Sequence, residues 1–353
     1  MTPKSVKQAA GLRLLAAFRD AGAQEIAPNI LLPAESLLDL YGEDIRARAY
    51  VTSDPIRGEM MLRPDFTVPV VQAHMENGAE PARYCYLGEV FRKQDMGDTR
   101  PETPRDSEYL QAGFELFSRD PAADAEVFGL FHDLLAPYDL RAEMGDMGLL
   151  LDAVRGLPLP DARRDALLHH IWRPGRFARL LDRFSHPTPV RDFPDNSAPW
   201  AGLRTRDDMI ARITRLRTDA AVAPLPPLWG ERLQRLFDLC APAPDALAQL
   251  RDLAADMPAI AGAVDRIAAR MDAIAARGID PARITFNASH GRTTLEYYDG
   301  FTFSFSADRD SWPPVASGGR YDALTRVLGK GREIPAVGGI IRPGLIAELG
   351  GVA

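Results

Sequence analysis

The sequence predicts an α+β fold in which a core containing a β-sheet is interrupted by a helical segment. Three observations support this fold class. Between Arg83 and Phe117, two runs rich in aromatic and branched residues, YCYLGEVFR and EYLQAGFELF, have the composition of strands. From about Arg141 to Arg277 strand-like runs disappear, and Ala, Leu, Arg and Asp dominate. The run ITFNASHGRTTLEYYDGFTFSFSA then returns to strand composition.

The N-terminal region predicts a helix followed by an extended segment. Apolar residues recur at helical spacing from Val6 to Phe18, and Gly22, Pro28 and Pro33 then break the helix. Further on, an extended run ends at Pro64 and a second helix is expected to follow. Asp and Thr side chains accept hydrogen bonds from free N–H groups at such a helix entrance. Asp65 and Thr67 are therefore predicted at the start of this helix.

The two strands after Arg83 are joined by a charged separator, KQDMGDTRPETPRDS, which is too long for a tight hairpin and is predicted to be a solvated loop. In the second strand, a period of two places Tyr109, Gln111, Gly113 and Glu115 on one face. A polar strip of this kind suits a small polar ligand lying on the sheet, although a sheet face that is merely wetted by solvent gives the same pattern.

The helical segment carries one apolar stripe at steps of three and four residues, which predicts helices packed on each other, with Pro258 starting a second helix. The stripe consists of Leu247, Leu250, Leu253, Met257, Ile260, Val264, Ile267, Met271 and Ile274. After it, Phe301, Phe303 and Phe305 alternate with Thr302, Ser304 and Ser306, as in a strand. We therefore divide the chain into a core at residues 1–140 and 279–353 and a helical insertion at 141–278.

The composition excludes several classes of protein. The chain has 353 residues, 46% of them apolar and 26% charged, and a formal net charge of −7, which is typical of a folded globular protein. No apolar run reaches the roughly 18 residues that span a bilayer, and the start reads as an amphipathic helix rather than a signal peptide. We expect a cytoplasmic location. Two cysteines without a CxxC pair argue against a disulfide framework and a structural zinc site.

Common catalytic motifs are absent from the sequence. It contains no GxxxxGK[ST], HExxH or GxSxG pattern, so we expect no metal, no cofactor and no covalent nucleophile. Residues 155–217 contain 13 arginines and 7 aspartates with no Lys or Glu, a local charge of +6 in an acidic protein. Such a patch suits phosphates or an acidic partner, but it lacks the aromatic interleaving of a nucleic-acid surface, so tRNA is not expected as a partner.

Several blocks of the sequence resemble, in the same order, those of the histidyl-tRNA synthetase catalytic domain. The blocks are RPDFT, YLGEVFRKQD followed by EYLQAGFE, LEYYDG, and SGGRYDALTRVLG, and LPAESLLDLYGE also fits the N-terminal region of that family. The resemblance implies a class II aminoacyl-tRNA synthetase fold: an antiparallel sheet flanked by helices, dimeric through the N-terminal segment that contains the prolines.

The sequence also departs from the synthetase pattern at two arginine positions. An arginine is expected four residues before Tyr297, where this chain has Thr293. Arg292 is adjacent, but a one-residue shift in a strand points a side chain to the opposite face. The arginine expected after PAVG is replaced by Leu345, with Arg342 three residues early and Pro343 expected to disturb the following helix.

The chain stops at Ala353, so we expect it to lack the anticodon-binding domain of roughly 90 residues that a synthetase carries. This combination resembles the family of ATP phosphoribosyltransferase regulatory subunits. The resemblance implies a non-catalytic subunit that activates the short-form catalytic subunit in a hetero-oligomer and transmits feedback inhibition by L-histidine. The alternative is a diverged or truncated histidyl-tRNA synthetase that forms an aminoacyl adenylate.

The resemblance also implies a histidine-like pocket. Glu115 and Tyr298 would contact the imidazole. Asp65, Thr67 and Gln111 would contact the amino group, and Asp65 is shorter by one methylene than the glutamate of the synthetases. Arg92 would bind the carboxylate, because a guanidinium can donate two parallel hydrogen bonds to a carboxylate. Tyr297, Tyr321 and Arg320 are expected to support the walls of the pocket.

Overall fold

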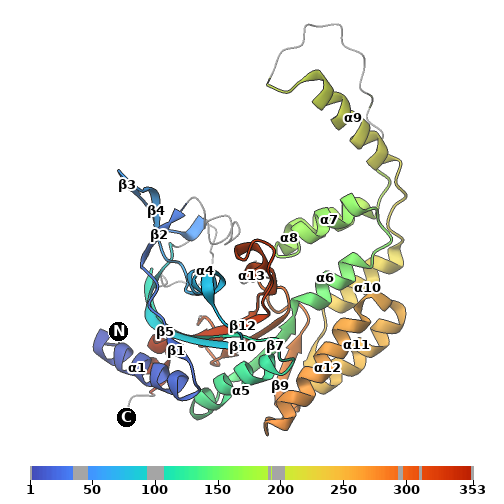
Figure 1. The fold of residues 1–353 in the computed structure, drawn as a ribbon. Coiled ribbons are helices and arrows are strands. Elements are labelled where there is room, and N and C mark those ends of the chain that lie inside the picture. Colours follow the sequence, from blue (N-terminus) through green and yellow to red (C-terminus); the bar gives the residue numbers. More distant parts are fainter. Residues whose placement is uncertain are drawn as a thin grey trace.

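A mixed nine-stranded sheet forms the centre of the part of the chain that the computed structural model describes, in the order β1-β5-β6-β12-β11-β10-β7-β9-β8 (Figure 1). The described residues are 2–34, 47–93, 107–189, 192, 203–292, 297–309 and 312–350. A second sheet has the order β2-β4-β3. The strands are β1 Gln24–Glu25, β2 Leu31–Pro33, β3 Val51–Asp54, β4 Gly58–Leu62, β5 Ala82–Phe91, β6 Glu108–Phe117, β7 Arg141–Asp146, β8 Cys240–Pro242, β9 Ile284–Asn287, β10 Phe301–Ser306, β11 Ala316–Arg320 and β12 Ala336–Ile341.

Helices cover both faces of the large sheet (Figure 1). The α-helices are α1 Lys4–Asp20, α4 Thr67–Asn77, α5 Ala123–Leu135, α6 Met147–Arg155, α7 Asp161–His169, α8 Pro174–Phe184, α9 Arg206–Ala220, α10 Pro227–Phe237, α11 Ala243–Asp256, α12 Ala261–Ala276, α13 Asp322–Leu328 and α14 Pro343–Glu348. The 3-10 turns are η2 Ala136–Tyr138, η3 Pro258–Ile260 and η4 Pro281–Arg283. These elements confirm the predicted α+β class.

The two faces of β6 bury different kinds of residue. Ala112, Phe114 and Leu116 belong to a large apolar cluster that includes residues of α1 and α5. Gln111 and Glu115 alternate with them and are also buried. The aromatic residues of the second face form a separate cluster with residues of α4 and α13. The predicted period of two is confirmed, and it places the polar strip beneath α4 and α13.

The central strands pair antiparallel, from β5 through β6, β12, β11 and β10 to β7. Because β12 lies between β6 and β11, segments far apart in the sequence are neighbours in the sheet. The strand alternation predicted around Phe301 is confirmed as β10. The predicted stripe of the helical segment is also confirmed, since its apolar residues are buried in α11, η3 and α12.

The start of the helical segment differs from the expectation. Residues 141–146 form strand β7, which pairs antiparallel with β10 and parallel with β9. The sequence RAEMGD has no β-branched or aromatic residue, so its propensity for a strand is weak, and the pairing on both sides determines its conformation. The division at 140/141 and 278/279 stays a prediction.

The helices between α6 and α10 extend away from the sheet (Figure 1). α9 lies farthest out and contains no buried residue. A complete capping box starts it, in which Thr205 and Asp208 bond each other's backbone N–H groups. The charged loop predicted between Lys93 and Ser107 lies outside the described residues, except at its two ends. Within the described residues, no helix combines the length and apolar character needed to cross a membrane.

Candidate functional site

Glu115 is the centre of a buried polar cluster on the β6 face beneath α4 and α13. Its Oε1 atom accepts hydrogen bonds from the hydroxyls of Thr67 at 3.0 Å and Tyr86 at 2.9 Å. Its Oε2 atom accepts one from the Tyr321 hydroxyl at 2.5 Å. Burial raises the pKa of Glu115 to about 7, although these three hydrogen bonds lower it. The carboxyl group is therefore fixed in place and titrates near neutral pH.

Glycines in the neighbouring strands make the space for this cluster. Gly113 of β6 pairs with Tyr86 of β5, and a Cβ atom at Gly113 would lie 2.2 Å from the Tyr86 ring. Gly338 of β12 pairs with Glu115, and a Cβ atom there would lie 1.6 Å from Oε2 of that carboxyl group. Both contacts are too short for any side chain. The sheet thus accommodates the carboxylate and the tyrosine ring only because these two positions are glycine.

The entrance of α4 contributes the next two predicted residues. Asp65 is buried, and its Oδ1 atom accepts a hydrogen bond from the Val68 N–H at 3.4 Å. Its Oδ2 atom accepts one from the Tyr297 hydroxyl at 3.2 Å. Thr67 is the first residue of α4 and bonds Glu115 as described above. The predicted position of Asp65 and Thr67 at a helix entrance is confirmed, and the two elements share one hydrogen-bonded cluster.

Gln111 adds a buried acceptor to this face of β6. It is 1% exposed and lies on the same face of β6 as Glu115. Its side-chain Oε1 atom is buried without a hydrogen bond in the part of the chain that the structure describes. An unsatisfied buried acceptor costs about 1–3 kcal/mol. A ligand that donates hydrogen bonds at this position would remove that cost.

Tyr298 and Arg92 complete the set of predicted residues. The Tyr298 ring lies 5.1 Å from that of Tyr297, centroid to centroid. Burial raises the pKa of the Tyr298 hydroxyl, as do the charges of Glu115 and Asp65, whereas the positive charge of Arg92 lowers it. Arg92 donates from Nε to the Pro64 carbonyl at 2.8 Å. The seven predicted residues therefore lie in one region. It contains the carboxylates of Asp65 and Glu115, and the positive charge of Arg92 influences it electrostatically.

Three contributors to this region were not predicted as ligand contacts. Tyr86 bonds Glu115 directly, and the alternation in YCYLG was the only signal for it in the sequence. Tyr321 was expected only to support a wall, yet it makes the 2.5 Å hydrogen bond to Glu115. Arg342 donates to the Pro314 carbonyl, and its charge also lowers the pKa of Tyr298.

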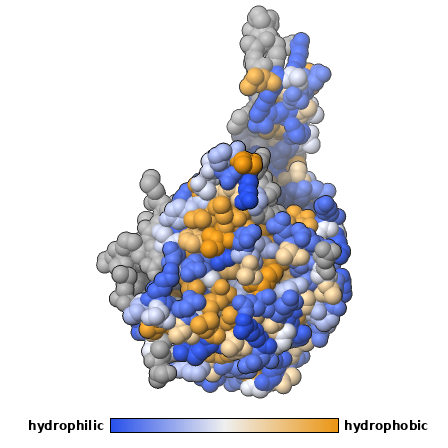
Figure 2. Space-filling model, turned by 60° about the vertical axis from the view of Figure 1, so that its left-hand side comes forward, coloured by the Kyte–Doolittle hydropathy of each residue, from blue (hydrophilic) through white to orange (hydrophobic). Residues whose placement is uncertain are grey.

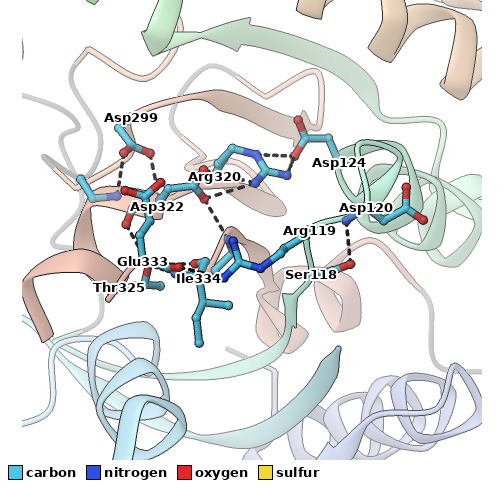
Figure 3. Close-up of polar contacts among 12 residues, drawn as sticks. Ser118, Arg119, Asp120, Asp124, Asp299, Arg320, Asp322, Thr325, Glu333 and Ile334 are labelled. Atoms are coloured by element: carbon cyan, nitrogen blue, oxygen red, sulfur yellow. Dashed lines mark hydrogen bonds and ion pairs between the residues drawn. The ribbon is translucent and has the colours of Figure 1, made fainter. Parts of the chain in front are cut away.

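Arg320, the other expected wall residue, belongs to a chain of buried and partly buried ion pairs (Figure 3). Its guanidinium bonds Asp124 at 2.6 Å and Asp322 at 3.2 Å. Asp124 also accepts from Arg270 at 2.8 Å, and Arg270 reaches Asp146 at 2.9 Å. Although burial raises the pKa of Asp124, the charges of Arg270 and Arg320 hold it below its usual value. The chain of ion pairs thus connects α12, α5 and β11.

This chain ends beside the Glu115 cluster. Tyr321 lies between Arg320 and Asp322 in the sequence, so the ion pairs fix the backbone on both sides of it. Asp299 fixes the same turn, because it accepts the N–H groups of Asp322 at 3.0 Å and Ala323 at 2.7 Å (Figure 3). Burial and the charge of Asp322 raise the pKa of Asp299 to about 7.

This chain lacks arginine at two positions where the synthetases have one, and carries Thr293 and Leu345 there. Thr293 lies outside the described residues. Arg292 donates from Nε to the Ile171 carbonyl at 3.1 Å, and its guanidinium lies 4.3 Å from the ring centroid of Phe237. Arg292 is therefore held by residues of the helical segment.

At the second position, Leu345 lies in α14 and packs against the large apolar cluster. The expectation that Pro343 disturbs this helix was wrong. Pro343 occupies the first turn of α14, where its missing N–H has no intrahelical partner to lose. Separately, no group of three or more His, Cys, Asp or Glu side chains in the described residues is arranged to hold a metal ion.

Comparison with known proteins gives the same family. The family model described as histidyl-tRNA synthetase matches residues 1–186 and 208–343. The ATP phosphoribosyltransferase regulatory subunit of Agrobacterium fabrum is 33% identical to this chain, with 92% of each chain covered. The protein of the same name from Allorhizobium ampelinum is 32% identical, with 92% of this chain and 93% of that one covered.

Solved structures share the fold. An ATP phosphoribosyltransferase regulatory subunit/histidyl-tRNA synthetase from Bacillus halodurans matches with a TM-score of 0.72 at 18% identity, covering 99% of this chain and 80% of that one. A histidine–tRNA ligase subunit from Alicyclobacillus acidocaldarius matches with a TM-score of 0.61 at 21% identity, covering 99% and 94%. The fold is thus the class II synthetase fold of histidyl-tRNA synthetase, and the chain belongs to the family of ATP phosphoribosyltransferase regulatory subunits.

Proposed function

We propose that this chain is a non-catalytic regulatory subunit that activates the short-form ATP phosphoribosyltransferase and takes part in its feedback inhibition by L-histidine. The partner joins ATP and phosphoribosyl pyrophosphate to give phosphoribosyl-ATP, the first step of histidine biosynthesis. Family membership supports the regulatory role. The observation that carries the histidine part is the buried Glu115 cluster with the unpaired acceptor of Gln111 beside it.

The chemistry of the cluster suits histidine. The Glu115 carboxylate would accept a hydrogen bond from an imidazole N–H, with Tyr298 as a second contact. The ammonium group would donate to Gln111 Oε1, to Asp65 and to Thr67. Arg92 would pair with the ligand carboxylate, and the charge of Arg342 acts on the same region.

The alternative function is a diverged histidyl-tRNA synthetase that forms an aminoacyl adenylate. Two positions argue against it. Thr293 stands where an arginine would stabilise charge during adenylate formation. Leu345 stands where an arginine would stack on ATP, and it packs against the large apolar cluster instead. We infer that the amino-acid pocket persists without the groups for adenylation.

The direct test is an activity assay of the short-form catalytic subunit at saturating ATP and phosphoribosyl pyrophosphate. We expect the rate of phosphoribosyl-ATP formation to rise when this chain is added and the two chains to co-elute in size-exclusion chromatography. The matched control is the same assay with heat-denatured protein. Absence of both activation and co-elution, together with histidine-dependent exchange of pyrophosphate into ATP, would establish the synthetase alternative.

A regulatory pocket also requires reciprocal coupling. If bound histidine weakens activation, binding of the catalytic subunit must change the affinity for histidine by the same factor. We expect calorimetric titration of this chain with histidine to give different dissociation constants with and without the partner, by roughly fivefold or more. An Arg92→Gln variant should bind histidine weakly in both cases. Identical wild-type constants would remove this pocket from the feedback mechanism.

We further propose that two copies of this chain pair within the hetero-oligomer, through the side that carries β2 and β3. Figure 2 shows apolar side chains gathered over the middle of the side that lies on the left in Figure 1. The exposed apolar residues of the N-terminal part include Ile30 at 45%, Leu31 at 37% and Val51 at 40%. A patch of this kind on a folded protein indicates a contact surface. Neither tRNA nor a membrane is part of this proposal, and we place the complex in the cytoplasm.

A further inference from the structure

A second polar pocket lies far from the Glu115 cluster in the sequence and the fold, where the segment after α8 faces α9. Its volume is about 600 Å³. Its polar wall residues are Asp182, Arg183, His186, Thr188, Arg212, Arg217 and Asp219. Most of these belong to the arginine-rich part of the sequence, which the proposed function does not use.

The carboxylates of this pocket already have partners, and that of Asp182 lies 3.7 Å from His186 Nδ1. Asp219 Oδ1 accepts from Arg163 Nε at 2.7 Å, and its Oδ2 accepts from Arg183 Nη2 at 3.2 Å. Arg212, by contrast, has no carboxylate within ion-pair distance in the part of the chain that the structure describes. The lining contains three arginines and two aspartates, and Asp219 also pairs with Arg163 behind it, so positive charge remains in excess.

Arg163 adds a buried positive charge directly behind this wall. It is 2% exposed, and its Nη2 atom donates to the Asp219 carbonyl at 2.6 Å and to Thr188 Oγ1 at 3.4 Å. Its Nη1 atom is buried and has no hydrogen-bond partner among the described residues. The Asp219 carboxylate balances the charge of this guanidinium, whereas the buried Nη1 donor remains unsatisfied, which carries a desolvation cost.

We propose that this pocket binds a small molecule that carries phosphate groups. The planar, positively charged guanidinium group can donate two hydrogen bonds at once to the oxygens of a phosphate group. Leu216 and the two prolines that flank Thr188 supply an apolar wall for the organic part of such a molecule. The concave shape and the volume, which falls within the range of small-molecule sites, favour a small ligand over the backbone of an RNA. The site is independent of the histidine pocket.

The test is calorimetric titration of the full chain with inorganic pyrophosphate and, separately, with ATP. We expect dissociation constants tighter than about 1 mM. Arg212→Gln should weaken binding by roughly tenfold, because it removes one charged hydrogen-bond donor from the wall. Arg215→Gln is the matched control, since it removes the same charge from the same helix outside the wall. It should change the dissociation constant by less than about twofold. Circular dichroism should show both variants folded.

Equal weakening by the two substitutions would mean diffuse electrostatic attraction and would overturn the proposal. So would the absence of heat with both probes. A short RNA that binds with the same dependence on Arg212, while pyrophosphate does not bind, would assign the surface to nucleic acid instead.

Discussion

Glu115 retains its proton over a pH range in which an exposed glutamate has lost it. Its pKa is about 7 in the folded chain against 4.5 for an exposed glutamate, because burial penalises the charged form more than three hydroxyl donors favour it. A folded-state pKa above the unfolded one gives stability that is fully present at low pH and is lost as the pH rises through about 7. The group that would bind the ligand therefore reduces the stability of the fold at neutral pH.

This linkage predicts the behaviour of Glu115→Gln. Relative to this variant, the free energy of unfolding of the wild type should fall between pH 5 and pH 8.5, by on the order of 3 kcal/mol. Urea unfolding of both proteins across this range measures the difference. Asp299, whose pKa is also raised to about 7, is present in both proteins and cancels. A difference that does not change with pH would mean that Glu115 is ionised throughout.

Gly338 gives a second prediction at the same carboxylate. A Cβ atom at this position would lie 1.6 Å from Glu115 Oε2, so Gly338→Ala must displace the carboxylate from Tyr321 or move β12. We expect a loss of histidine affinity of roughly tenfold or more and a loss of stability of about 2 kcal/mol. Calorimetric titration and thermal unfolding would measure both.

The matched control is Gly262→Ala in α12. There the nearest heavy atom is 3.6 Å from the new Cβ, and alanine favours a helix over glycine by about 1 kcal/mol. This variant should be as stable as the wild type or more so and should bind histidine normally. Unchanged affinity in Gly338→Ala would show that the ligand does not use Glu115.

The packing of helix α12 depends on Arg270, a charged residue that faces the core. Arg270 pairs with both Asp124 and Asp146, and all three side chains are less than 9% exposed. Arg270→Met would leave two buried carboxylates with fewer partners, at a cost of about 3–5 kcal/mol. Arg266→Met is the control on the same helix, because Arg266 is 56% exposed and bonds Asp152 at 3.2 Å. It should cost about 0.2–1 kcal/mol.

Equilibrium unfolding in urea separates these two variants. A small cost for both would mean that the buried pairs contribute little beyond their desolvation. A large cost for Arg270→Met together with weaker histidine binding would show that the ion pairs also position Tyr321, which follows Arg320 in the sequence.

Periodic elements could be predicted from the sequence, whereas long-range pairing could not. The alternation in β6 and the stripe through α11 and α12 are repeated local signals, and both are confirmed. Strand β7 has weak local propensity and forms because β10 and β9 flank it. Asp124 and Arg270 are 146 residues apart, and nothing near either residue indicates the pair. Within the candidate site, the residues of the sequence motifs could be predicted. The contributions of Tyr86 and Arg342 become visible only in the folded structure.

For the whole molecule, the apolar side in Figure 2 gives a prediction about assembly. The wild type should be at least dimeric, and the double variant Ile30→Asp and Val51→Asp should be monomeric in light scattering coupled to size-exclusion chromatography. Two charges at these half-exposed positions would be buried without partners in a dimer. Leu228→Asp, at a residue 52% exposed in α10, should leave the dimer intact. A dimer that persists in the double variant would place the contact elsewhere.

The position of β12 between β6 and β11 has a consequence for biosynthesis. Both edges of β12 are paired with neighbouring strands. The second row of hydrogen bonds of β6 can therefore form only after the residues of β12 have been synthesised. At typical translation rates the residues between Phe117 and Ala336 take roughly 10–40 s to appear. During that time the nascent chain presents an unpaired strand edge next to an apolar face. The protein should therefore depend on a ribosome-associated chaperone more than its size alone implies.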